Sequence, residues 1–288
     1  MNRFPFRCSA VALTMLIGLG ADAAHLDGAD IPTGGLTLQA TQDTPTGFGN
    51  SSGTQESLGG SELNALYADI EGRKLTIGIT GNLEANFNKL FIFFDATDGG
   101  EASLAGDNAD GGFGEINNLQ GLMFEGGATM DHGLRFELGG GFLGVRFFDL
   151  IDNTASDVFT AGGPGSLPAE AAGNSAVMVG WDNSNAAGVD GSSAAGAGTA
   201  TTGIELEIDL IEAFGATQGD IGISAIITSG DATFLSNQAL PGLNGASNLG
   251  SPSGQTLPVA VVPGAPIPEP TAAALLGLAA LATASRRR

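Results

Sequence analysis

The chain contains many short segments in which apolar and polar residues alternate. In residues 75–79 every second residue is leucine or isoleucine, with threonine and glycine between them. Residues 204–210 alternate isoleucine and leucine with glutamate and aspartate. Successive side chains of a strand point to opposite faces, so each segment is predicted to be a strand with one buried face. Residues 90–94 form a continuous apolar run, which is typical of a strand in the middle of a sheet.

About ten such segments lie between glycine-rich turns in residues 61–243. They predict an all-β fold, an antiparallel β-sandwich of about ten short strands. The composition agrees, because 47 glycines and 6% aromatic residues favour turns and short strands over a helical bundle. Residues 153–175 and 183–202 are rich in Gly, Ala and Ser and are predicted to be loop insertions. Residues 210–216 fit either a short helix or a turn.

Two segments that flank this domain have a different composition. Residues 25–60 are rich in Gly, Thr and Ser and are predicted to form a flexible, exposed N-terminal arm, with one strand near residues 36–40. Residues 244–265 are predicted to be a Pro/Gly spacer, because seven of the twelve prolines lie between Pro241 and Pro270. The sandwich domain itself is therefore assigned to residues 61–243.

Residues 1–24 have the features of a secretory signal peptide. Arg3 and Arg7 precede an apolar stretch, and small residues before Ala24 form a cleavage site. The Sec-type export machinery is therefore an expected partner. The single cysteine, Cys8, would leave with the peptide, so the exported protein would have neither a disulfide nor a thiolate metal site.

Residues 266–288 combine three features in a fixed order. Pro268-Glu269-Pro270 is followed by an apolar stretch at residues 271–284, and Arg286, Arg287 and Arg288 come last. As a helix the apolar stretch would be about 21 Å long, which is shorter than a hydrocarbon core of about 30 Å. The arginines would stay on the cytoplasmic side of a membrane. The segment is predicted to be an apolar sorting helix, and the alternative is a marginal membrane anchor that is never cut.

This tail resembles the PEP-CTERM sorting signal of surface proteins from exopolysaccharide producers. The resemblance implies recognition by a membrane exosortase, cleavage near residues 268–270, and delivery to the cell surface or extracellular matrix. Until it is cut, the protein would be attached to the membrane through the apolar stretch.

The body is similar to a sandwich domain of such proteins, which is distantly like family 9-like carbohydrate-binding and DOMON-type domains. The segments that carry this similarity are "LNALYAD", "RKLTIGITGNL", "TGIELEIDL" and "FLSNQALPGL". It implies a non-catalytic, structural or adhesive role in association with extracellular polysaccharide.

The charge balance limits the partners further. The chain has 31 acidic and 10 basic residues, a net charge of -21. Such a body repels phosphate backbones, so nucleic acid is not an expected partner. Calcium is the one cofactor that the sequence indicates, because it is bound by oxygen atoms on glycine-rich loops. The candidate calcium ligands are Asp95, Asp98, Glu101, Asp107, Asn108 and Asp110. The alternative is plain turn chemistry, in which Asp side chains bond their own backbone.

Motifs for enzymatic chemistry are weak. A G-x-S-x-G match at residues 49–53 and a G-x-G-x-x-G match at residues 139–144 both lack the helix that should follow them. His132, next to Asp131, is predicted to be an exposed histidine without a special role. The sequence therefore predicts no catalytic residues and no enzyme. The alternatives are a secreted glycoside hydrolase, for which no carboxylate pair stands out, and a calcium-dependent assembly module.

A sugar contact has one candidate. Trp181 and Asp182 stand at the end of a predicted strand, where an indole could meet a sugar ring. The alternative is a tryptophan in the core. The phenylalanines lie mostly in apolar runs and are interpreted as core residues.

Overall fold

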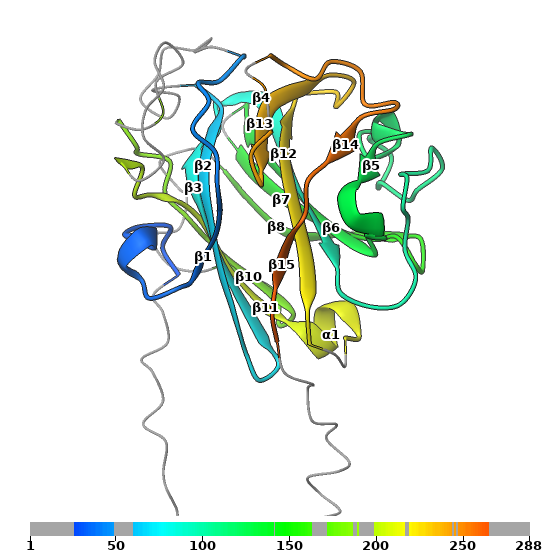
Figure 1. The fold of residues 1–288 in the computed structure, drawn as a ribbon, viewed down its shortest axis with the longest axis horizontal. Helices are drawn as coiled ribbons and strands as arrows, with labels where there is room; N and C mark the ends of the chain where they lie inside the picture. The colour runs from blue at the N-terminus through cyan, green and yellow to red at the C-terminus, as the bar shows by residue number, and fades with distance from the viewer. Residues whose placement is uncertain are drawn as a thin grey trace, which may run out of the picture.

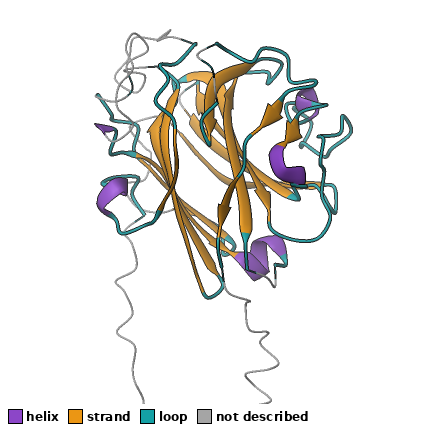
Figure 2. Cartoon of the chain, viewed as in Figure 1, coloured by secondary structure: helices purple, strands orange, loops and turns teal. Residues whose placement is uncertain are grey.

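The computed structural model describes residues 26–48, 60–140, 142–162, 172–186, 189, 199–216, 219–243, 245 and 247–264. The predicted signal peptide and sorting segment lie outside these residues. Two antiparallel sheets face each other and form the sandwich (Figures 1 and 2). The all-β class and the antiparallel sheets are thus confirmed.

The strands divide between two large sheets and one small pair. The six-stranded sheet has the order β1 (Leu38–Thr41), β2 (Glu62–Glu71), β3 (Lys74–Asn82), β11 (Gly203–Asp209), β10 (Val177–Trp181), β9 (Ala172–Gly173). The seven-stranded sheet has the order β13 (Leu235–Leu240), β12 (Ile221–Thr228), β4 (Asn86–Asp95), β6 (His132–Gly139), β7 (Phe142–Asp149), β8 (Thr154–Gly162), with β15 (Ala260–Val262) on β12. The parallel pair is β5 (Met123–Phe124) and β14 (Thr256–Leu257). The short helices are η1 (Ile31–Thr33), η3 (Asn117–Leu119), η4 (Glu125–Gly127) and α1 (Leu210–Phe214).

The alternating segments build the core between the sheets. Leu75, Ile77 and Ile79 of β3 are paired in register with Ile208, Leu206 and Ile204 of β11, and all six side chains are buried. Their apolar faces pack against the inner face of the seven-stranded sheet, which includes Phe94 and Phe136. Burial of this face is the main favourable term for folding.

The continuous apolar run in β4 has a separate explanation. Its side chains alternate between two clusters: Phe94 belongs to the core between the sheets, whereas Phe91 and Phe93 face outward. A cap segment, residues 101–128, covers these outward rings with Leu104, Ile116 and other apolar side chains. The run is continuous because β4 is buried on both faces.

Beside these rings the outer face carries buried charges. Lys89 of β4 lies 2.9 Å from Glu137 of β6, and Arg135 lies 3.2 Å from the same carboxylate. Glu115 of the cap segment forms ion pairs with both Lys89 and Arg135. Buried charges are tolerated when they are paired, so the cap segment is held by ion pairs as well as by apolar contacts.

Two predictions about the flanking segments differ from the structure. Part of the predicted arm, residues 26–48, packs on the six-stranded sheet: β1 pairs with β2, and Ile31 is buried against Tyr67 and Ala65. Residues 247–264 are no spacer, because β14 pairs with β5 and β15 pairs with residues 221–223 of β12. Their apolar residues are sparse, but several of them, such as Ile31, Leu257 and Val262, fill places in clusters that other segments build.

One predicted loop insertion is also different. Residues 154–162 form the edge strand β8, which pairs along its whole length with β7. Most of its described side chains are exposed and Val158 alone among them is fully buried, so the strand lacks the alternation that would have predicted it. The ambiguous segment at 210–216 is the helix α1, whose N-cap Asp209 accepts hydrogen bonds from the Ile211 and Glu212 amides.

Candidate functional site

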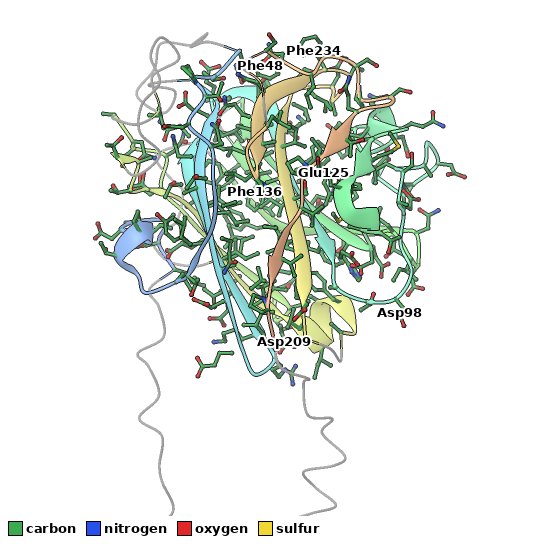
Figure 3. All side chains as sticks on the ribbon, viewed as in Figure 1. Phe48, Asp98, Glu125, Phe136, Asp209 and Phe234 are labelled. Carbon is green, nitrogen blue, oxygen red and sulfur yellow. The ribbon has the colours of Figure 1, made fainter. Side chains whose placement is uncertain are left out.

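The two ends of the sandwich carry different surfaces. At the end where α1 lies, a cleft of about 910 Å³ opens between the loop after β4, η4 and β15. We call it the acidic cleft. Its lining combines four carboxylates with small and apolar residues: Asp95, Asp98, Glu125 and Asp220 on one hand, and Val259, Val261 and several glycines on the other. Figure 3 labels Asp98 and Glu125 of this wall.

Asp95 is the carboxylate in the cleft whose acidity is altered. Burial raises its pKa above the usual value, and the nearby negative charge of Asp131 raises it further. The Thr129 amide, 3.4 Å from Oδ2, lowers the pKa, by less than burial raises it but by more than Asp131 does. A carboxyl group with a raised pKa in a cleft can act as a proton donor or as a neutral hydrogen-bond donor.

Asp131, behind the cleft wall, is completely buried and fully bonded. Its Oδ2 accepts hydrogen bonds from the Ala96 amide at 2.7 Å, the Thr97 amide at 2.5 Å and the Thr97 hydroxyl at 3.1 Å. Its Oδ1 lies 2.6 Å from Nδ1 of His132. These bonds fix the loop that carries Asp95 and Asp98, so Asp131 positions the cleft wall.

His132 is not the exposed histidine that the sequence suggested. Only 2% of its surface is accessible. The imidazole stacks on Phe214 of α1 and on Phe147, with ring centroids 4.7 and 5.4 Å away. Since its parity in β6 is that of Phe136, the side chain points into the core, and α1 closes over it.

The six candidate calcium ligands do not meet at one point. Asp95 and Asp98 line the cleft, whereas Glu101 accepts hydrogen bonds from the Ala105 amide and from Asn108. Asp110 accepts bonds from the Gly112 amide and from Asn117, and Asp107 is exposed elsewhere on the cap segment. In the part of the chain that the structure describes, no three His, Cys, Asp or Glu side chains are grouped closely enough to hold a metal ion. The observed contacts are those of turn chemistry.

The predicted sugar contact at Trp181 is not available. The indole is 5% exposed, belongs to the core between the sheets and stacks near Phe136 at 6.1 Å. Asp182 accepts a hydrogen bond from the Ser184 amide at 2.8 Å and forms a turn. The alternative, a tryptophan in the core, matches the structure.

The opposite end of the sandwich carries a group of phenylalanines that sequence reasoning missed. Phe87 and Phe142 form one ring pair and Phe48 and Phe234 another, each with centroids 6.1 Å apart. Phe87 and Phe234 are each 42% exposed. Figure 3 shows Phe48 and Phe234 together, far from Asp209 beside α1. We call these four residues the aromatic end.

A signal for the aromatic end is present in the sequence. Phe87 stands between asparagines in "ANFNK", and Phe234 follows Asp, Ala and Thr in "DATFL". Neither residue has the apolar neighbour on both sides that marks the core phenylalanines of β4. A large apolar residue in a polar turn is a candidate for an exposed contact.

Buried side-chain amides hold the backbone at this end of the sandwich. Asn185 Nδ2 donates to the carbonyls of Gly81 and Thr202, and its Oδ1 accepts from the Thr201 and Thr202 amides. Asn183 exchanges two hydrogen bonds with the backbone of Leu83. Gln238 of β13 accepts from the Leu63 amide and so joins the two sheets. Two buried carboxylates complete this hydrogen-bonded frame: Glu62 accepts a hydrogen bond from the Thr46 amide, near Phe48, and Glu84 accepts one from Asn86, next to Phe87.

Comparisons with known proteins add no assignment. No protein-family model matches the chain, and neither a curated protein nor a solved structure matches it significantly. Within the described residues, no helix has the length and apolar character needed to cross a membrane. Function is therefore argued from the sequence signals and from the two ends of the sandwich.

Proposed function

We propose that this protein is exported, sorted to the cell surface or extracellular matrix through exosortase processing of its tail, and non-catalytic once there. The observation that carries the proposal is the order of Pro268-Glu269-Pro270, an apolar stretch and a terminal arginine cluster, in a chain that begins with a signal-peptide pattern. The packing of residues 247–264 supports it. Strand β15 (Ala260–Val262), which pairs with β12, lies only a few residues before the proposed processing site, so cleavage there would leave this strand on the domain.

Intact-mass analysis of the exported protein tests the sorting step. We expect the protein from a producing cell to lack Arg286, Arg287 and Arg288, and a strain without exosortase to retain them in the membrane fraction. A variant with Arg286–Arg288 replaced by glutamines is the matched control, and it should remain uncut. An exported protein whose mass includes the three arginines would refute processing near Pro270.

The proposed role at the surface is structural or adhesive association with polysaccharide. Much of the outer face of each sheet is covered by the chain itself, the cap segment on one sheet and residues 26–36 on the other. The loops at the two ends therefore remain as contact surfaces. Binding of the full chain to immobilised extracellular polysaccharide tests the role, and the absence of retention on every polysaccharide tried would overturn it.

The acidic cleft favours one other candidate, a secreted glycoside hydrolase. Such enzymes use a carboxyl group of raised pKa as the general acid and a second carboxylate as base or nucleophile. Asp95 has the raised pKa, and Asp98, Glu125 and Asp220 share its cleft. None of the residues that line the cleft is aromatic, which argues against a stacked sugar ring there.

An assay of reducing-end release from polysaccharides distinguishes the two candidates. A hydrolase would release reducing ends, and Asp95→Asn would lower the rate by about a hundredfold or more, the usual contribution of a general acid. Asp107→Asn, at an exposed carboxylate of the cap segment that does not line the cleft, is the matched control. Wild-type protein that releases no sugar supports the non-catalytic role.

A further inference from the structure

We propose that the aromatic end is a binding surface for a neutral polysaccharide. The inference rests on the proposed association with polysaccharide and names the contact surface and the class of polymer. It depends on three observations: a ring held in a strained backbone, a second ring pair at a neighbouring turn, and the absence of unpaired cations among the described residues.

The backbone holds Phe87 outward at some cost. Its φ is +71°, a region that bulky residues rarely adopt and that persists only where surrounding contacts impose it. The Asn88 amide donates to Asn86 Oδ1 at 3.1 Å, and Asn88 Nδ2 donates to the Ser61 hydroxyl at 3.2 Å. The strain therefore presents a phenyl ring to solvent where a glycine or asparagine would satisfy the backbone better.

The Phe87 ring packs against the backbone of two glycines, Gly139 and Gly140. A Cβ at Gly139 would stand 2.8 Å from two ring atoms, and one at Gly140 would stand 3.0 Å from a third. Glycines in this hairpin let one face of the ring rest on the backbone, and Phe142 flanks it. The ring is fixed in orientation although 42% of its surface is exposed, as a stacking platform requires.

One ring of the second pair, Phe234, belongs to the turn against which Phe87 packs, and Phe48 of the N-terminal segment packs on it. A Cβ at Gly230, in the β12–β13 turn, would lie 3.1 Å from the Phe87 carbonyl oxygen. The same turn carries Phe234 and is closed by hydrogen bonds between Ser229 and Phe234. One exposed ring of each pair, Phe87 and Phe234, therefore adjoins this turn. A chain-like ligand whose rings present C–H faces could contact both, whereas a single sugar would stack on one.

The charged side chains of the described residues favour a neutral polymer over an anionic one. Every lysine and arginine of the described residues is ion-paired with a carboxylate, so none of these cations is left to hold a sulfate or uronate. Asp231, exposed in the Phe234 turn, has its pKa lowered by hydrogen bonds from Ser229 and Thr233 and is therefore ionised. Its carboxylate would repel an anionic chain but can accept bonds from sugar hydroxyls.

Affinity electrophoresis of the full chain tests the proposal. The probes are two neutral glucans, laminarin and dextran, and the anionic polymer alginate. Phe87→Ala and Phe234→Ala should each weaken binding to the retained neutral glucan by about tenfold, the effect of removing a central contact. Phe113→Ala is the matched control. Phe113 is also exposed, by 62%, but it belongs to the cap segment, where its ring contacts Arg135 of β6 and Arg146 of β7. Thermal melting of each variant confirms that it is folded.

The outcomes separate this inference from the function on which it rests. Loss of binding in the two aromatic-end variants, with Phe113→Ala unchanged, supports it. Undiminished binding of a neutral glucan by both variants overturns the aromatic end as the site but leaves polysaccharide association standing. Retention by alginate alone overturns the neutral class. A wild-type protein retained by no polysaccharide overturns both.

Discussion

Each end of the sandwich holds its backbone with a buried polar side chain, but the two side chains differ in chemistry. At the cleft end, the carboxyl group of buried Asp131 accepts hydrogen bonds from the amides of the Ala96–Thr97 loop. At the aromatic end, the neutral amide of Asn185 forms hydrogen bonds with backbone groups of two segments, at Gly81 and at Thr201–Thr202. The cleft end exposes carboxylates, and the aromatic end exposes phenyl rings.

This difference separates the two ends in their response to solution conditions. Carboxylates titrate and are screened by salt, whereas amides and phenyl rings are neither charged nor titratable. A surface that binds by ring contacts can therefore work across the variable conditions outside a cell. Substitutions at one end at a time test this difference.

The largest effect is expected at Asp131. Asp131→Ala leaves the Ala96 and Thr97 amides and the His132 ring nitrogen without their acceptor in a buried site. Each unmet buried group is costly, so the free energy of unfolding should fall by about 3 kcal/mol or more. Urea unfolding measures the loss.

The control for Asp131 lies in the same cleft. Asp98 is exposed, and Asp98→Ala should change the free energy of unfolding by less than about 0.5 kcal/mol. Equal losses in the two variants would mean that the cleft wall is not fixed by Asp131.

The second effect is expected at the frame of the aromatic end. Asn185→Ala removes four hydrogen bonds to backbone groups and should lower the free energy of unfolding by about 2 kcal/mol. Because the amide does not titrate, the loss should be the same at mildly acidic and at neutral pH. Ser184→Ala, at the exposed neighbouring position, is the control. A loss that varies strongly with pH would mean that Asn185 acts through a titrating neighbour and not through its own neutral amide.

These two residues show how far the sequence predicts the fold. Leu75, Ile77 and Ile79 are recognised as buried because alternation is a local pattern that the sheet preserves. Nothing local marks Asn185, whose partners lie about a hundred residues away in the case of Gly81. The strand predicted near residues 36–40 is found as β1, but strand β8 and the packing of residues 26–48 on the sheet are missed, because their neighbours, and not their own periodicity, decide them.

The candidate sites illustrate the same limit. Trp181 was singled out by residue type, but its register opposite Ile204 turns it into the core. The aromatic end is formed by four phenylalanines from separate segments, so it exists only after folding. The acidic segment at 95–110 was recognised by composition, yet the fold distributes its side chains over the cleft and the cap segment.

A smaller effect should distinguish the two ends by its sign. The pKa of Asp95 is raised above its ordinary value of 3.8, so as pH rises the unfolded chain releases this proton before the folded protein does. Stability is then lost between 3.8 and the folded pKa. Asp95→Asn should therefore stabilise the protein at neutral pH, by less than about 1 kcal/mol because solvent screens a half-exposed carboxylate.

Asp231 should behave in the opposite way. Its pKa is lowered by hydrogen bonds from Ser229 and Thr233, so it stabilises the fold above its ordinary value of 3.8, and this contribution is lost as pH falls through the folded pKa. Asp231→Asn should lower the melting temperature slightly at neutral pH and leave it unchanged in strong acid. Melting curves of both variants across pH provide the test, and shifts of the same sign would remove the contrast between the ends.

The smallest effect is expected from Gly139, and it tests whether the glycines under Phe87 fix the orientation of its ring. Gly139→Ala places a methyl group 2.8 Å from the Phe87 ring, so the ring must move while its chemistry is unchanged. Affinity for the neutral glucan should fall by about threefold, compared with about tenfold for Phe87→Ala. Gly144→Ala in the same hairpin is the control, because its methyl group would lie 3.6 Å from Phe142, an ordinary contact. If Gly139→Ala binds as the wild type does while Phe87→Ala does not, the phenyl ring contributes by its area alone and its fixed orientation is irrelevant. If both glycine variants lose affinity equally, either substitution shifts the whole hairpin, and the Phe87 ring is then held less rigidly than the cleft wall at the other end.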